Sequence, residues 1–173
     1  SAWRRGADQI TLDLEDSVPP DRKEEARARV REAIPIAARG GATVSVRINR
    51  DSWPADIAAA VWPGLSAIVF PKAEDPEVVR EAGALVERLE GERGLPPSVR
   101  LSLLIETVKG LDNAEALLQA HPRVIGVGGP AQADFTVDLG IVLDPTLDQL
   151  DWARGELDLL LRASGARGLG RWA

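Results

Sequence analysis

The sequence predicts an α/β fold of the (β/α)8 barrel type, in which parallel strands alternate with helices. Five short apolar segments have the composition of buried strands, and the segments between them have the apolar spacing of amphipathic helices. Strand starts recur every roughly 25 to 35 residues, which is the length of a strand plus a crossover helix. Charged residues follow the strand segments, as they do at the rim of a parallel barrel, where strand ends converge on one site.

Each predicted strand is short, rich in aliphatic or β-branched residues, and followed by Gly, Pro or charged residues. The predicted strands are residues 9–14, 43–48, 67–70, 101–105 and 124–128. Near the end of the chain, residues 165–172 form either a stunted strand or a tail.

The predicted helices lie between and after these strands. They are residues 21–38, 54–61, 75–89, 113–120 and 147–162. In the first helix, Asp21 with Glu24 three residues later has the spacing of a capping box, and Pro35 is expected to kink or end the helix. Pro54 stands in the first turn of the second helix, a position that proline favours.

The chain is short for a complete barrel, which typically needs about 250 residues. Its 173 residues suffice for about five to six βα units. We therefore expect residues 1–173 to form a single, partial barrel domain, with an open doubly wound sheet as the alternative. Because a barrel that lacks strands exposes unpaired edges, we expect either further segments outside these residues or a neighbouring subunit that covers the gap.

The composition excludes several classes of function. With a net charge of −6, the chain lacks the positive field that non-specific binding to nucleic acid or anionic membrane requires. The absence of cysteine excludes thiol nucleophiles and zinc–thiolate sites and is compatible with a cytoplasmic protein. No apolar run approaches the roughly 20 residues of a membrane-spanning helix. We expect a cytoplasmic protein with neither nucleic-acid nor membrane partners.

Five motifs, taken together, are similar to those of one family. They are Ile10–Val18 (ITLDLEDSV), Val46–Asn49 (VRIN), Val69–Lys72 (VFPK), Ile105–Gly110 (IETVKG) and Asp134–Gly140 (DFTVDLG). In this order and spacing they resemble the citrate lyase beta-subunit-like branch of the HpcH/HpaI aldolase family, over about residues 7–140. The resemblance implies a modified (β/α)8 barrel that uses Mg²⁺ to cleave or form a carbon–carbon bond beside a carbonyl group.

The resemblance also implies a class of substrate. Members of this branch act on acyl thioesters, such as citryl, malyl or citramalyl groups on coenzyme A or a carrier protein. The sister aldolases, which act on free hydroxy-oxo acids, have His where this chain has Asp16. We therefore expect a Mg²⁺-dependent lyase that cleaves 3-hydroxy-acyl thioesters by retro-Claisen or retro-aldol chemistry, assembled as a homo-oligomer, a trimer or hexamer.

Three alternatives to this function stay open. One is a class II aldolase that acts on free 2-oxo acids, and another is a thioesterase for malyl-type thioesters. The third is a non-catalytic family member that serves as an assembly subunit.

By the same resemblance, Glu106 and Asp134 are the metal ligands. Mg²⁺ is commonly held by one or two carboxylates, while substrate and water fill its remaining positions, so two acids meet the need. The alternatives are that Glu106 caps the following helix and that Asp134 starts a solvated turn.

Arg47 is expected to bind a substrate carboxylate and to steady negative charge that develops on oxygen. Its alternative is a salt bridge to Asp13, Glu15 and Asp16. Strand alternation points Asp13 and Glu15 to one side and Asp16 to the other, so all three should not reach one ion. We expect these acids to orient Arg47 and metal-bound waters. Glu15 and Asp16 are the catalytic candidates, because crowded carboxylates raise one another's pKa and can then supply an acid or base.

Lys72 is expected to bind substrate or to pair with Glu106, and is otherwise a solvated lysine at a strand end. Gly129 and Pro130, in the glycine-rich stretch after the fifth strand, are expected to leave backbone room beside the metal and to contact the substrate. His121 lies in a loop at the opposite end of the barrel and, as the only histidine, cannot build a histidine metal site.

Overall fold

The computed structural model describes residues 2–129, 132–142, 150–165 and 167–168. The chain divides into two compact units, residues 1–69 with 82–100 and residues 70–81 with 101–173. Within the described ranges, no helix is both long enough and apolar enough to cross a membrane.

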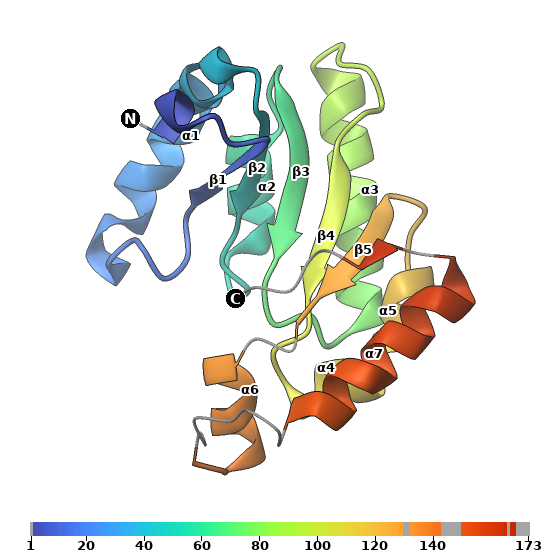
Figure 1. The fold of residues 1–173 in the computed structure, drawn as a ribbon. Coiled ribbons are helices and arrows are strands. Elements are labelled where there is room, and N and C mark those ends of the chain that lie inside the picture. The colour runs from blue at the N-terminus through green and yellow to red at the C-terminus, as the bar shows by residue number, and fades with distance from the viewer. Residues whose placement is uncertain (1, 130–131, 143–149, 166, 169–173) are drawn as a thin grey trace. The chain divides into compact units, whose positions relative to one another are not determined.

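The first unit is built on parallel strands that lie side by side in Figure 1. Its elements are η1 (Ala2–Arg5), β1 (Gln9–Asp13), η2 (Pro20–Arg22), α1 (Lys23–Ala37), η3 (Ala38–Gly40), β2 (Thr43–Arg47), α2 (Trp53–Ala60), β3 (Leu65–Phe70) and the part of α3 (Pro76–Glu92) from residue 82 onward. In the β1–β2 register Asp13 stands opposite Arg47, and in the β2–β3 register Arg47 stands opposite Val69. The first unit therefore aligns the carboxyl ends of its strands.

The core of the first unit is aliphatic. Its fully buried side chains include Ile34 of α1, Val44 and Val46 of β2, Ile57 of α2 and Ile68 of β3. Burial of such side chains is the main favourable contribution to folding, about 1.5–3 kcal/mol for each.

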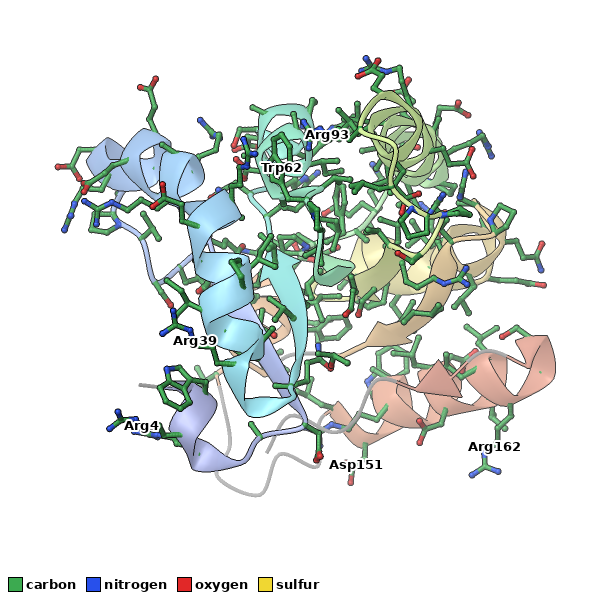
Figure 2. The ribbon with its side chains drawn as sticks, turned by 90° about the horizontal axis from the view of Figure 1, so that it is seen from above. Arg4, Arg39, Trp62, Arg93, Asp151 and Arg162 are labelled. Atoms are coloured by element: carbon green, nitrogen blue, oxygen red, sulfur yellow. The ribbon has the colours of Figure 1, made fainter. Side chains whose placement is uncertain are left out.

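Two arginines of the first unit make cation–π contacts with the ring of Trp62. The guanidinium carbons of Arg31 and Arg93 each lie 4.0 Å from the centre of the Trp62 ring, and Figure 2 shows Trp62 beside Arg93. Arg93 also donates hydrogen bonds to the carbonyl oxygens of Ala58 and Val61, at the C-terminal end of α2. A cation at this end satisfies carbonyl groups that have no partner inside the helix.

The second unit has the same parallel pattern. Its elements are the first turns of α3, then β4 (Arg100–Leu104, from residue 101), α4 (Val108–Asp112), α5 (Ala114–Gln119), β5 (Val124–Gly128), α6 (Gln132–Leu139), α7 (Asp151–Ser164) and β6 (Arg167–Gly168). Strand β5 pairs in parallel with both β4 and β6, and α7 packs beside α5 (Figure 1). The short β6 agrees with the expected stunted strand.

The predicted strands are confirmed, with boundaries that shift by one to two residues, and β5 spans residues 124–128 as predicted. Two local predictions about the helices are wrong. The first helix has no side-chain cap, because a 3-10 turn at Pro20–Arg22 precedes it and Arg22 stands at its N-cap. Pro35 lies inside this helix, which continues to Ala37, so a kink at Pro35 stays a prediction. Helix α4 is not among the predicted helices, and residues 147–149 of the last predicted helix lie outside the described residues.

Candidate active site

The first group of charged side chains lies at the carboxyl ends of β1 and β2, within the first unit. Arg47 makes a bidentate pair with Asp13, with Nε 2.8 Å from Oδ1 and Nη2 2.6 Å from Oδ2. Its Nη1 lies 2.9 Å from Glu15 Oε2, an ion-pair contact without hydrogen-bond geometry, and donates to Asp16 Oδ2 at 3.3 Å. One guanidinium group therefore contacts three carboxylates, and the alternative that Arg47 forms a salt bridge to these acids is observed.

This pairing fixes the charge of Asp13. Burial by itself would raise the pKa of Asp13, but hydrogen bonds from Arg47, from the Ser17 hydroxyl and from the Glu15 amide hold the pKa well below its ordinary value. The pKa of Arg47 is raised, chiefly by its hydrogen bond to Asp13. The expectation that crowding raises the pKa of the acids is therefore wrong for Asp13, because burial, which would raise the pKa, is outweighed by the hydrogen bonds from Arg47, Ser17 and Glu15.

The expected strand alternation beyond β1 is also wrong. The strand ends at Asp13, whose Oδ1 accepts a hydrogen bond from the Glu15 amide at 2.9 Å. Asp13 Oδ2 accepts from the amide and the hydroxyl of Ser17, at 3.2 and 2.6 Å. The backbone therefore curls into a turn around the Asp13 carboxylate, and the curl brings both Glu15 and Asp16 to Arg47.

The second group of charged side chains lies within the second unit and centres on Lys72. The Lys72 amide donates to Glu106 Oε2 at 3.0 Å, and the Lys72 ammonium lies 3.3 Å from Asp134 Oδ1. Glu106 is buried, with 4% of the residue exposed, whereas the Asp134 side chain is 44% exposed. Lys72 has φ +47°, a positive value that no other non-glycine residue in the described ranges adopts. Such backbone strain is concentrated at functional sites.

Local structure explains where the two acids of this group lie. Glu106 follows β4, and the next residue, Thr107, caps α4 by accepting a hydrogen bond from the Gly110 amide at 3.1 Å. The alternative that Glu106 is the helix cap is therefore wrong. Asp134 lies in the first turn of α6 rather than at a strand end or in a solvated turn, which corrects the sequence-based placement. Asp138 Oδ2, one turn further along α6, accepts from the Val108 amide at 2.7 Å and ties α6 to α4.

Gly129 has a packing role next to Glu106. Its φ is +117°, and a Cβ at this position would overlap the carbonyl oxygen of Ile105. The backbone room expected here is therefore occupied by the Ile105 carbonyl group. A substrate contact by Gly129 stays a prediction, and Pro130 lies outside the described residues. His121 Nδ1 accepts a hydrogen bond from the Arg123 amide at 3.2 Å, in the loop before β5.

Glu106 and Asp134, the two acids next to Lys72, offer the type of ligand that Mg²⁺ prefers. Both offer hard carboxylate oxygens, and Asp134 already contacts a cation, the ammonium group of Lys72. Two protein ligands suffice for Mg²⁺, which dehydrates reluctantly and keeps several waters. Among the residues that the structure describes, no group of three or more His, Cys, Asp or Glu side chains is placed to hold a metal ion.

Sequence reasoning missed three residues that support the first group, Lys23, Asn49 and Asp56. Asp56 is fully buried in the first turn of α2, where a carboxylate is unexpected unless it is paired. Two features of the sequence could have indicated them: Asn49 follows Arg47 by two residues, and Asp56 lies in the first turn of the next helix.

Parallel strands that alternate with helices, with acids and bases just beyond the strand ends, define an α/β domain of the barrel class. The chain belongs to the HpcH/HpaI aldolase/citrate lyase family, whose profile matches residues 1–170. The predicted fold and the family resemblance are therefore confirmed.

Two curated relatives and one solved structure illustrate the similarity. The citrate lyase subunit beta of Leuconostoc mesenteroides subsp. cremoris is 34% identical over 164 residues, which cover 92% of this chain and 54% of that protein. The L-malyl-CoA/beta-methylmalyl-CoA lyase of Rhodobacter capsulatus is 34% identical over 141 residues, 78% of this chain and 44% of that protein. A citrate lyase structure from Burkholderia xenovorans LB400 superposes with a TM-score of 0.79 at 24% identity, over 92% of this chain and 54% of that one. The chain thus spans about half the length of the curated relatives that it matches.

Proposed function

We propose that this chain belongs to a carbon–carbon lyase that cleaves or forms a 3-hydroxy-acyl thioester of the citryl, malyl or citramalyl type. The observation that carries the proposal is the group formed by Lys72, Glu106 and Asp134, in a chain whose relatives are named as citrate lyase subunit beta and malyl-CoA lyases. Two acids beside a lysine with a strained backbone support a chemical role for this group, because such strain is concentrated at functional sites.

The family is generally dependent on a divalent metal ion, and we assign Glu106 and Asp134 as the residues that would hold Mg²⁺. The bound ion would act as a Lewis acid that polarises the substrate carbonyl group. Lys72 contacts both acids: its backbone amide donates to Glu106, and its ammonium group places a positive charge next to Asp134.

Arg47 is assigned to the substrate carboxylate, because its guanidinium stays charged and binds carboxylates through two parallel hydrogen bonds. Glu15 and Asp16 orient this guanidinium through their contacts with Nη1. Asp16 is the partner that a substrate carboxylate can displace, since its side chain is 67% exposed and its contact with Arg47 is the longest, at 3.3 Å.

A product assay separates the lyase from the competing activities. A lyase converts a malyl-type thioester into a shorter acyl thioester plus a 2-oxo acid, whereas a thioesterase releases the free thiol. Because the chain has no cysteine, a thiol reagent reports only on released coenzyme A. We expect a 2-oxo acid without free thiol. Free thiol would favour the thioesterase, activity on free hydroxy-oxo acids alone would favour the aldolase, and no turnover would favour the assembly subunit.

Metal binding tests the assigned ligands separately from turnover. With Mn²⁺ as the probe, Glu106→Gln should weaken binding at least about tenfold, because a neutral amide is a poor ligand for a hard cation. The matched control is Asp138→Asn, which removes a carboxylate from α6 that serves the Val108 amide. Equal Mn²⁺ affinity in wild type and Glu106→Gln would refute the assignment. The expected homo-oligomer is a separate prediction, which light scattering tests.

A further inference from the structure

The positions of Glu15 and Asp16 are not set by strand pairing. Strand β1 ends at Asp13, and the last hydrogen bond of the β1–β2 ladder runs from the Leu14 amide to the Arg47 carbonyl at 2.9 Å. Residues 14–17, here called the acidic turn, continue beyond that point. Three carboxylates crowd around Arg47 in this region, so their mutual repulsion opposes the observed arrangement. The Asp13 carboxylate holds the amides of Glu15 and Ser17, and further groups bind the carbonyl oxygens of the acidic turn.

Two side chains bind the carbonyl groups of the acidic turn. The Lys23 ammonium donates to the carbonyl oxygen of Leu14 at 2.7 Å and to that of Glu15 at 2.6 Å. Asn49 Nδ2 donates to the same Leu14 carbonyl oxygen at 2.9 Å. Lys23 begins α1 and Asn49 follows β2, so the turn is anchored from two elements. The Lys23 cation also offsets part of the negative charge that the turn carries.

Asp56 fixes the orientation of Asn49. Asp56 Oδ2 accepts hydrogen bonds from the backbone amide of Asn49 at 2.7 Å and from its side-chain Nδ2 at 2.8 Å. Both neighbours of Nδ2, the carboxylate and the Leu14 carbonyl, are acceptors, so only one orientation of the side-chain amide is compatible with them. Arg27 Nε donates to Asp56 Oδ1 at 2.7 Å and compensates the charge of this fully buried carboxylate. Asp56 therefore holds the Asn49 side chain in the orientation that contacts the acidic turn.

We infer that Lys23, Asn49 and Asp56 are positioning residues, which hold Glu15 and Asp16 against Arg47. Asp13 needs no such support, because the strand register already places it opposite Arg47. The inference deepens the proposed function and, for its catalytic consequence, rests on it: Arg47 can present its guanidinium to a substrate carboxylate only if the acidic turn keeps a fixed position.

Amide hydrogen exchange tests the anchors without any reference to turnover. Lys23→Met removes the half-buried ammonium, and Asn49→Leu removes the side-chain donor at similar volume. In both variants the amides of Glu15 and Ser17 should exchange about fivefold faster or more, because the turn loses hydrogen bonds that hold it closed. The Ile48 amide, bonded to the Val69 carbonyl in the β2–β3 ladder, should exchange at the wild-type rate.

The controls separate local loosening from general destabilisation. Val30→Ala leaves a cavity in the buried face of α1 and removes no contact of Lys23 or Asn49 with the turn. It should not selectively increase the exchange rates of the turn amides. Ser52→Ala removes the most distant contact of Asp56, at 3.5 Å, and a 3.3 Å hydrogen bond from Arg27 Nη2, but neither anchor of the turn, and should behave as wild type. Unchanged turn amides in Lys23→Met would overturn the inference. Equal acceleration at Ile48 would also overturn it, because the residues would then be general stabilisers.

Turnover tests the catalytic consequence. Lys23→Met should lower kcat/KM for the malyl-type thioester about fivefold or more, and Lys23→Gln, which keeps an N–H donor, should restore part of it. If kcat/KM is unchanged while the turn amides exchange faster, the positioning role in the reaction is wrong. If the wild type does not cleave the thioester, the proposed function fails, while the exchange experiment still decides whether the anchors hold the turn.

Discussion

Replacement of Arg47 by Met should destabilise the fold in a pH-dependent manner. Arg47 and its partners are mostly buried, with side-chain exposures of 22% for Arg47, 17% for Asp13 and 13% for Glu15. Removal of one member of a fully buried ion pair costs about 3–5 kcal/mol, because it leaves an uncompensated charge. Since about a fifth of Arg47 is exposed, we expect a loss of about 2–3 kcal/mol in the free energy of unfolding at neutral pH. For a chain of this length, that loss lowers Tm by about 5–10 °C.

The dependence on pH follows from the pKa of Asp13. Arg47 helps to hold this pKa below its unfolded-state value, so Asp13 contributes stability that is fully present above about pH 5. This contribution is lost as the pH falls below about 4, toward the pKa of the folded state. Arg47→Met removes the main group that lowers the pKa of Asp13 and leaves the hydrogen bonds from Ser17 and the Glu15 amide. The stability difference between wild type and variant should therefore be largest near pH 7 and should shrink below about pH 4.

Urea denaturation followed by tryptophan fluorescence at several pH values measures this difference. Arg39→Met is the matched control, because it removes the same charge from an exposed residue of η3 (Figure 2). We expect it to change the free energy of unfolding by less than about 0.5 kcal/mol at every pH. The reasoning would be refuted if both variants lost the same stability, or if the loss in Arg47→Met were equal at pH 7 and pH 3.5.

Two further predictions concern packing. Trp62→Leu should lower the free energy of unfolding by about 1–2 kcal/mol, because the guanidinium groups of Arg31 and Arg93 both lose their contact with the ring. A loss below about 0.5 kcal/mol in urea denaturation would contradict this. Gly129→Ala should cost more than about 2 kcal/mol, because the new Cβ overlaps the Ile105 carbonyl at a positive φ, whereas Gly155→Ala, in the open interior of α7, should stabilise by about 0.5–1 kcal/mol. Equal melting temperatures for these two glycine variants would show that the close approach at Gly129 is not rigid.

The sequence predicted the strands well and the site only in part, for identifiable physical reasons. Strand β5 was predictable because Gly and charged residues flank a short aliphatic run. The capping box failed because Pro20 starts a 3-10 turn that delays the helix to Lys23. Strand alternation could not place Asp16, since it applies only while the backbone stays extended, and that backbone ends at Asp13.

The supporting residues were harder to predict than the charged residues themselves. Asp56 and Asn49 act through contacts between segments far apart in the sequence, such as Asn49 with the Leu14 carbonyl. A single sequence carries no direct signal for such contacts. The positive φ of Lys72 was not predicted either, because the residues around it, VFPK, contain no glycine or asparagine that would indicate a left-handed backbone.

The contact between Arg47 and Asp13 is stronger than that between Lys72 and Asp134, and this difference bears on where a metal ion can enter. Arg47 binds Asp13 through two short hydrogen bonds and contacts two further acids, so a competing cation would have to displace several charge-assisted contacts at once. Lys72 reaches Asp134 through one contact of 3.3 Å, and that carboxylate is 44% exposed. Such a contact contributes little free energy and exchanges readily with another cation. The group around Lys72 therefore suits an exchangeable divalent ion, whereas the group around Arg47 suits a permanent guanidinium whose partners are rearranged only by a competing carboxylate.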